Sequence, residues 1–292
     1  MKRRTGLPPS LPLRRSLPLK TSDIPLEATS LFLFVGPSDS GKSYAASSFG
    51  LKSKEYGGDD DRPAYLMDCD GRVQALRGRP IVYDAYTNVE GAIGVLNRLN
   101  EIRETCVKHN RAPFHTLIGP DSFTSYCDFA IADSLEITEE ANVGKTKKSG
   151  RRRGDLQMLT VQDYGYEDEA VRQLLWEALT DIKKYANVIV TAHEVTKYKV
   201  IPGAAEGAPS VRVEDGLRVL GRDKISAKMP TKFDEIYHFL AKETIVSQKA
   251  VRRQVVFQDE LARTGYRQLA STTKYDITNK EFYPFWKELI SR

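Results

Sequence analysis

The chain has 292 residues, of which 40% are hydrophobic and 28% are charged, and its net charge is +5. These values are typical of a soluble globular protein, and the length allows one large domain or two small ones. No segment approaches the roughly 18 apolar residues of a membrane-spanning helix, so we expect no membrane partner. The three cysteines are isolated from one another, which argues against a disulfide framework or a zinc site and predicts a reducing, cytoplasmic setting.

Residues 1–28 have the composition of a flexible tail. They contain five prolines, and six Lys or Arg residues against two acidic ones. Such a segment buries too little apolar surface to fold alone. We interpret it as a solvated tail that packs loosely on the domain or on a neighbouring subunit. The alternatives are an arm for nucleic acid, a proline-rich ligand for a partner protein, and an organelle transit peptide.

The strongest motif follows this tail. The five apolar residues 31–35 predict a strand buried on both faces, and a Gly-x4-Gly-Lys-Ser loop and a helix come directly after it. This is the Walker A phosphate-binding loop. Glycines permit the backbone of the loop, whose amides point at phosphates, while Lys42 adds a charge and Ser43 can hold Mg²⁺. The predicted nucleotide-binding residues are Gly36, Pro37, Ser38, Asp39, Ser40, Gly41, Lys42, Ser43 and Tyr44.

Strands and helices alternate along the rest of the chain. We expect strands at 64–71, 80–83, 114–118 and 187–194, helices ending near 53 and spanning 88–108 and 167–185, then short strands at 235–240, 254–257 and 268–272 and a helix at 281–290. Two polar segments, about 130–160 and 196–229, are expected to be irregular loops. This alternation predicts an α/β fold, with a mostly parallel central sheet, helices on both faces and a short β-rich C-terminal part.

We divide the chain into three parts on this basis. Residues 1–28 are the tail, residues 29–245 are the core, and residues 246–292 supply C-terminal strands and a helix that complete the core.

Polar residues stand at the ends of several predicted strands. Asp68 and Asp70 end the second strand, Asp121 follows the fourth, and His193 and Glu194 end the fifth. In parallel α/β sheets ligands bind at the carboxyl ends of the strands. We therefore expect these side chains to converge with the phosphate loop on one edge of the sheet.

In this order, the motifs resemble those of the RecA-like branch of the P-loop NTPases, in particular phage-encoded RecA-like recombination ATPases. The resemblance covers roughly residues 30–245 and rests on the phosphate loop, the strand ending at 67–71, and the segments 121–124 and 188–194. It implies a Mg²⁺-dependent ATPase that acts on single-stranded DNA in recombination, annealing or replication. It also implies a homo-oligomeric ring or filament, in the host cytoplasm if the chain is phage-encoded.

The resemblance also implies roles for individual residues. Lys42 and Ser43 would bind phosphate and Mg²⁺, and Asp121 would hold the metal through water. Asp70 would polarise the attacking water. His193 would sense the γ-phosphate, with Glu194 beside it, so the expected catalytic residues are Asp70, Lys42, His193 and Glu194.

Two features depart from the family pattern. The family's water-activating acid is usually the longer Glu, where this chain has Asp70. Pro120 precedes Asp121, and because proline cannot donate to a central ladder, the strand is expected to end early and to displace Asp121. The structural alternatives are loop capping by Asp68 or Asp70, helix capping by Asp121, and a hydrogen-bonded His193 without a sensor role.

The two long polar segments are the candidate nucleic-acid loops. Six cationic residues fall within residues 145–153, and full engagement with phosphates would give a salt slope of roughly four log units per decade. The predicted DNA-binding residues are Lys145, Lys147, Lys148, Arg151, Arg152 and Arg153. Tyr126, Phe129, Tyr164 and Tyr166 flank them and are candidates for base stacking. The alternative is a basic loop with only non-specific attraction.

The site of a RecA-like ATPase is completed by a basic residue from a neighbouring subunit. The candidates for this role are Lys224, Lys228 and Lys274. Three other functions stay open: a DNA-packaging or helicase-type motor ATPase, a nucleotide-gated structural or adaptor protein with little turnover, and a small-molecule kinase.

Overall fold

The apolar segment before the phosphate loop forms the central strand of the sheet in the computed structural model. The structure describes residues 29–142, 152–153, 156–157, 161–201, 211–219, 225, 228–246, 249–258, 275–278 and 280–290. Its parallel strands are β1 (Leu31–Gly36), β2 (Ala64–Asp68), β3 (Ile81–Ala85), β4 (Thr116–Asp121), β7 (Asn187–Ile201) and β9 (Glu235–Val246). Every residue of β1 is buried, as expected for a strand covered on both faces.

Six strands pair in parallel in the order β9-β1-β7-β4-β2-β3. The sheet is extended beyond β9 by the antiparallel strands β10 (Lys249–Gln258) and β11 (Tyr275–Asp276). The expected α/β class with a mostly parallel sheet is therefore confirmed. β7 lies between β1 and β4, so the residues at its end stand between those that follow the other two strands.

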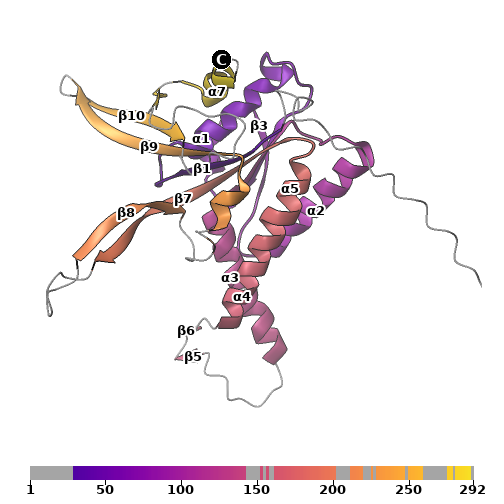
Figure 1. The fold of residues 1–292 in the computed structure, drawn as a ribbon. Coiled ribbons are helices and arrows are strands. Elements are labelled where there is room, and N and C mark those ends of the chain that lie inside the picture. Colours follow the sequence, from indigo (N-terminus) through magenta and orange to yellow (C-terminus); the bar gives the residue numbers. More distant parts are fainter. Residues whose placement is uncertain are drawn as a thin grey trace, which may run out of the picture.

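Helices cover both faces of this sheet (Figure 1). One face packs against α2 (Gly91–His109), α3 (Phe123–Asn142), α4 (Val161–Arg172), the π-helical turn η5 (Gln173–Ala178) and α5 (Leu179–Ile182). The other face packs against α1 (Lys42–Ser47), the 3₁₀ helix η2 (Ser48–Lys52) and α7 (Phe282–Ile290). None of the helices in the described part of the chain combines the length and the hydropathy that crossing a bilayer requires.

The face that carries α7 is unusually aromatic. Phe32 and Phe34 of β1 point toward it, because alternate residues of a strand face the same side. Phe34 lies 5.1 Å from Phe282 between ring centroids, and Phe32 lies 5.5 Å from Trp286. These contacts attach the C-terminal helix directly to the strand that leads into the phosphate loop.

Several sequence expectations are corrected by the structure. β4 continues through Pro120 to Asp121, so the strand does not end early. The N-cap of α2 is Glu90 and not Asn88, and the first-turn amide of Ile93 donates to the Asp133 carboxylate of α3 at 3.0 Å. The backbone of α2 therefore begins where a side chain from another helix satisfies it.

The two segments expected to be irregular contain regular structure. α3 extends to Asn142, and so residues 130–142 are helical. β7 continues to Ile201 and returns as the antiparallel strand β8 (Val211–Val219). Figure 1 shows the β7–β8 and β9–β10 hairpins as two arms that extend from the core. The expected strand at 268–272 lies outside the described residues.

Candidate active site

The phosphate loop (residues 36–43) connects β1 to α1 with backbone angles that need particular residues. Gly41 has a φ of 91°, in the left-handed region that favours glycine, and Asp39 has a φ of 60°. A Cβ on Gly36 would lie 2.3 Å from the carbonyl oxygen of Phe239. The glycines identified in the sequence are therefore required by the geometry of the loop.

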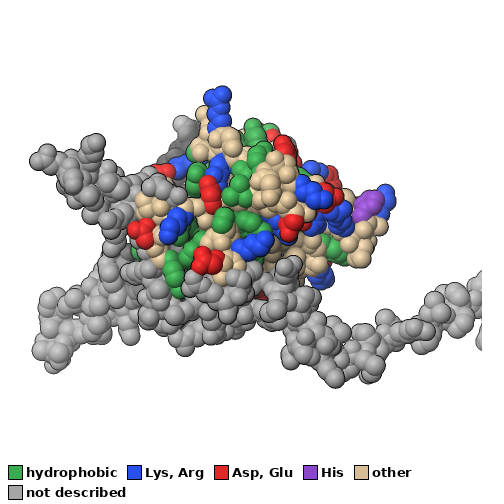
Figure 2. Space-filling view, turned by 90° about the horizontal axis from the view of Figure 1, so that it is seen from above, with side chains coloured by type: hydrophobic (Ala, Val, Ile, Leu, Met, Phe, Trp, Pro, Cys, Tyr) green, Lys and Arg blue, Asp and Glu red, His purple; other side chains and the backbone are tan. Residues whose placement is uncertain are grey.

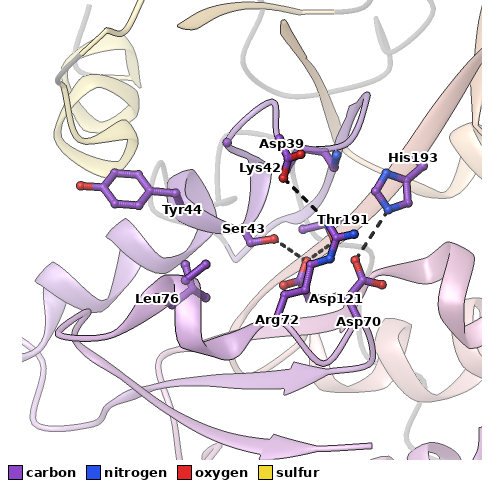
Figure 3. Close-up of a pocket in the computed structure, with 12 residues that line it drawn as sticks. Asp39, Lys42, Ser43, Tyr44, Asp70, Arg72, Leu76, Asp121, Thr191 and His193 are labelled. Atoms are coloured by element: carbon purple, nitrogen blue, oxygen red, sulfur yellow. Dashed lines mark hydrogen bonds and ion pairs between the residues drawn. The ribbon is translucent and has the colours of Figure 1, made fainter. Parts of the chain in front are cut away.

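A cavity of about 250 Å³ opens beside the loop. Asp39, Gly41, Lys42, Ser43 and Tyr44 line it from the loop and α1 (Figure 3). Its other walls include Asp70 and Arg72 after β2, Ala75 and Leu76 of the 3₁₀ helix η4 (Val73–Leu76), Asp121 at the end of β4, and Thr191 and His193 on β7. The structure thus brings together the ends of four separate strands, as expected.

The ammonium of Lys42 is buried against its own loop. Its Nζ donates to the carbonyl oxygens of Gly36 at 2.9 Å and Pro37 at 2.8 Å. Burial lowers the pKa of Lys42 to about 8, although Asp121, Asp70, Glu194 and Asp39 act to raise it. The side chain is therefore mostly protonated at neutral pH and loses its charge a short way above it.

Nucleotide affinity should consequently fall as the pH rises above about 8. Phosphate binds the protonated ammonium of Lys42. Above the pKa of Lys42, the protein without nucleotide has lost this proton, so it must take up a proton when nucleotide binds. The dissociation constant should be flat below this pKa and rise by up to about tenfold per pH unit above it. Titration with a non-hydrolysable ATP analogue between pH 7.5 and 9.5 checks this. Lys42→Arg, which keeps its charge, serves as the control, and a flat wild-type profile would contradict the assignment.

Asp121 is the most buried carboxylate of the cavity. Its Oδ1 accepts hydrogen bonds from the Ser43 hydroxyl at 2.9 Å and from the Thr191 hydroxyl. Burial raises the pKa of Asp121 to about 6, with a further contribution from the negative charge of Asp70. A hydroxyl beside a buried, electron-rich carboxylate fits the oxygen ligands that Mg²⁺ prefers, and water would supply its remaining ligands. Ser43 and Asp121 would hold the metal.

Asp70 is held in a different environment. Its Oδ1 accepts from the backbone amide of Ser122 at 3.2 Å, from the Ser122 hydroxyl at 2.7 Å and from the Ser125 hydroxyl. Burial acts to raise the pKa of Asp70, but contacts with His193, Ser125 and Ser122 outweigh it and hold the pKa well below its usual range. Asp70 therefore stays ionised across the physiological pH range.

Asp68 has a structural role. Its Oδ1 accepts from the amides of Asp70 at 3.1 Å and Arg72 at 3.3 Å, and its Oδ2 accepts from the amide of Val73 at 3.0 Å. This carboxylate shapes the turn that presents Asp70 and Arg72 to the cavity. Asp68, the last residue of β2, thus organises the turn, and Asp70, which follows it, faces the site.

His193 and Glu194 face different surroundings, because neighbouring residues of a strand point to opposite sides. His193 lines the cavity with its Nε2 3.6 Å from Asp70 Oδ2, and its backbone amide donates to the Thr124 hydroxyl at 3.2 Å. The Glu194 carboxylate lies 3.0 Å from the buried His238 Nδ1 on β9. Glu194 does not line the cavity, although its negative charge acts on Lys42, and its catalytic role stays a prediction.

Two polar lining residues, Thr191 and Arg72, were missed by the sequence reasoning, as were the apolar Ala75 and Leu76. Thr191 contributes the second hydroxyl at Asp121, and its signal was a single polar residue inside an otherwise apolar strand. The Arg72 guanidinium lies 3.6 Å from the Asp39 carboxylate of the phosphate loop, and both side chains are exposed. Figure 3 shows Arg72 reaching across the front of Asp121 toward the loop. Nothing in its local sequence marked it.

The candidate nucleic-acid residues are only partly described. Arg152 and Arg153 form β5 (Arg152–Arg153), which pairs with β6 (Leu156–Gln157), whereas Lys145, Lys147, Lys148 and Arg151 lie outside the described residues. Tyr126 and Phe129 are buried in the core, with the Tyr126 hydroxyl donating to the Ala170 carbonyl at 3.0 Å. The expectation that these two rings stack on bases is therefore wrong.

The candidates for a basic residue acting between subunits are also only partly described. Lys228 is exposed just before the 3₁₀ helix η6 (Met229–Lys232). Lys224 and Lys274 lie outside the described residues.

Comparison with protein-family models and with curated proteins found no match for this chain.

Proposed function

We propose that this protein is a RecA-like P-loop ATPase that binds ATP with Mg²⁺ and hydrolyses it while acting on single-stranded DNA. The convergence of Lys42, Ser43, Asp70, Asp121 and His193 on one cavity supports this most directly. These residues come from four separate parts of the chain, and each matches a role that the RecA-like resemblance assigns. A loop that only bound phosphate would not need two carboxylates beside it, one kept ionised, Asp70, and one deeply buried, Asp121.

The two carboxylates of the cavity suit two different tasks. Asp70 is ionised, and its hydrogen bonds from Ser122 and Ser125 fall on Oδ1, so Oδ2 can accept one from a water molecule and orient it for attack on the γ-phosphate. Ser43 and Asp121 are the residues that would hold Mg²⁺, which when bound would neutralise part of the phosphate charge. His193, held near Asp70, would contact the γ-phosphate or the water and so sense whether the phosphate is present.

Lys42 would change partners when nucleotide binds. In this structure its ammonium is held by two carbonyl oxygens of the loop. A phosphate oxygen carries more negative charge than a carbonyl, so transfer of the ammonium to the β- and γ-phosphates is favourable. Lys42 would then neutralise the charge that develops on the leaving group and the transferred phosphoryl.

The order of the strands supports the RecA-like assignment over a generic nucleotide-binding protein. Because β7 lies between β1 and β4, it places Thr191 in contact with Asp121 and His193 near Asp70. The resemblance expects a polar γ-phosphate sensor at this strand end.

Single-stranded DNA is proposed as the partner because of where charge is concentrated. On the described part of the face shown in Figure 2, Lys and Arg side chains are interspersed with Asp and Glu. The cationic run 145–153 is denser, with six positive residues in nine. The β7–β8 and β9–β10 arms extend past the carboxyl edge of the sheet, where the loops of a RecA-like protein meet nucleic acid in a ring or filament.

DNA should therefore stimulate ATP hydrolysis. The rate is measured for the full chain with and without single-stranded DNA, and DNA affinity is measured across a salt series. A variant with Arg152→Ala and Arg153→Ala should lower the salt slope by about 1.4 and reduce stimulation. A matched control replaces Arg111 and Lys108, which are exposed on and just after α2, with alanine.

The outcome also separates the competing functions. If neither DNA nor RNA changes the rate or the nucleotide affinity, the nucleic-acid role fails. Slow turnover without stimulation would instead favour a nucleotide-gated adaptor, and directional movement along duplex DNA would favour a packaging or helicase-type motor.

A further inference from the structure

We propose that Tyr44 is the platform on which the base of the nucleotide stacks, and that Arg79, paired with Glu281 just before the C-terminal helix α7, holds this platform in place. The inference rests on the proposed function, because it places the base of the nucleotide whose phosphates the loop would bind. It adds a ligand subsite and a link between that subsite and α7.

The cavity has two chemically different ends. Lys42, Asp70, Asp121 and His193 make one end charged. In Figure 3, Tyr44 and Leu76 lie on the side of the cavity away from His193. A nucleoside triphosphate has the same division, with charged phosphates at one end and a flat, weakly polar base at the other. With the phosphates at the loop, the base falls on the end that Tyr44 and Leu76 provide.

Tyr44 has the exposure that a stacking platform needs. It follows Ser43 on the first turn of α1, and 42% of its surface is accessible although it lines the cavity. The guanidinium carbon of Arg79 lies 4.0 Å from the centroid of its ring. The guanidinium covers one face of the ring and leaves ring surface open for a base.

Arg79 is itself fixed by a dense set of contacts. Its two terminal nitrogens donate to the Glu281 carboxylate at 2.7 and 2.5 Å, and its Nε donates to the Ser47 hydroxyl at 2.8 Å. Only 12% of the Arg79 side chain is exposed. A bidentate pair of this kind restricts both partners. The Tyr44 hydroxyl also lies 3.5 Å from Glu281, so the ring is oriented at its face and at its edge.

Glu281 connects this cluster to the end of the chain. It immediately precedes α7, whose Tyr283 amide donates to the Ser48 hydroxyl of η2 at 2.8 Å. Arg79 and Glu281 are separated by 202 positions in the sequence. Docking of the C-terminal helix therefore determines whether Tyr44 is presented as a rigid platform or as a mobile surface side chain.

The test compares a ligand that has a base with one that lacks it. Binding of a non-hydrolysable ATP analogue and of inorganic tripolyphosphate, each with Mg²⁺, is measured by calorimetry on the full chain. Tyr44→Ala should weaken binding of the ATP analogue by roughly tenfold or more, and leave tripolyphosphate within about twofold of wild type. Tyr44→Phe, which keeps the ring, should retain most of the affinity for the analogue.

A second pair of variants tests the link to α7. Arg79→Lys keeps the charge but loses the planar stack and the bidentate pair, so it should weaken the ATP analogue and spare tripolyphosphate. Arg111→Lys is the matched control, since Arg111 is an exposed arginine that pairs with Asp61 away from the cavity. Thermal melting of each variant verifies the fold.

Equal effects of Tyr44→Ala on both ligands, or no effect on either, would overturn the platform. A wild-type protein that binds tripolyphosphate as tightly as the ATP analogue would overturn it as well, while leaving the phosphate site intact. A wild-type protein that binds neither ligand would overturn the nucleotide site itself and the platform with it.

Discussion

Replacing Lys42 with alanine should reduce ATP hydrolysis by at least about a hundredfold. The ammonium is the cation of the cavity closest to the loop carbonyls, and it would bind the β- and γ-phosphates. Its loss removes charge stabilisation where negative charge develops during phosphoryl transfer. Steady-state phosphate release at saturating ATP and Mg²⁺ measures the effect.

The structure also dictates the controls for this variant. Lys42 is buried and satisfies two carbonyl oxygens, so alanine leaves Gly36 and Pro37 without a donor and weakens the loop. Lys42→Met preserves the length of the side chain and tests the charge alone. Lys108→Ala removes an exposed lysine from the last turn of α2 and should retain the wild-type rate. An unchanged rate in both Lys42 variants would remove the phosphate-loop assignment.

Replacing Asp121 with asparagine should change activity and stability in opposite directions. Hydrolysis should fall by about a hundredfold or more, because the residue that would hold Mg²⁺ loses its charge. Stability without Mg²⁺ should rise at neutral and higher pH. The pKa of Asp121 is raised to about 6 in the folded protein, so the folded state pays for an ionised, buried carboxylate there.

The sign of the pH dependence follows from this shift. Between the usual pKa of about 4 and the folded value of about 6, the folded protein holds a proton that the unfolded chain has released. The wild type therefore loses stability as the pH rises through this window, by up to about 3 kcal/mol. Asparagine accepts the same hydrogen bonds from Ser43 and Thr191 without this loss.

Thermal melts at pH 4 and pH 8, in the presence of a chelator, measure the predicted difference. Asp121→Asn should melt close to wild type at the lower pH and above it at the higher one. Asp59→Asn, in an exposed loop, should follow wild type at both. A variant that is less stable than wild type at pH 8 would contradict the prediction, because the attraction between the carboxylate and Lys42 would then outweigh the cost of burying its charge.

Sequence alone predicted the features that depend on local signals. The run of apolar residues in β1, the glycines of the loop and the helix that follows are each encoded within a few positions. The convergence of Asp70, Asp121 and His193 was also predictable, because parallel strands place their carboxyl ends on one edge.

Features that depend on distant partners were not predictable. Pro120 suggested an early end to β4, but the strand continues because β2 pairs with it as far as Asp121, past a register shift, while the pairing with β7 ends at Ile118. The N-cap of α2 was misplaced because Asp133, on a different helix, satisfies the first turn. The pairing of Arg79 with Glu281 has no local signature at all. Such choices are made by tertiary contacts, which override the preferences of a short segment.

The site also shows what strand alternation can and cannot resolve. His193 and Glu194 stood together at a strand end, and the side-chain period of two allows only one of them to face the cavity. The sequence expectation placed both residues in the catalytic set. The choice depended on His238 of β9, which pairs with Glu194 across the end of β1.

The hydrogen bonds from Lys42 to its own loop affect how nucleotide binding is driven. Gly41 and Asp39 have left-handed conformations and the ammonium bridges the carbonyls of Gly36 and Pro37, so the loop is held in one conformation by its own contacts. A loop held by its own contacts has little backbone entropy to lose on binding, and this is how rigid sites gain affinity. When nucleotide binds, the Lys42 ammonium would exchange the neutral carbonyls of Gly36 and Pro37 for charged phosphate oxygens. The free energy of phosphate binding is then chiefly electrostatic.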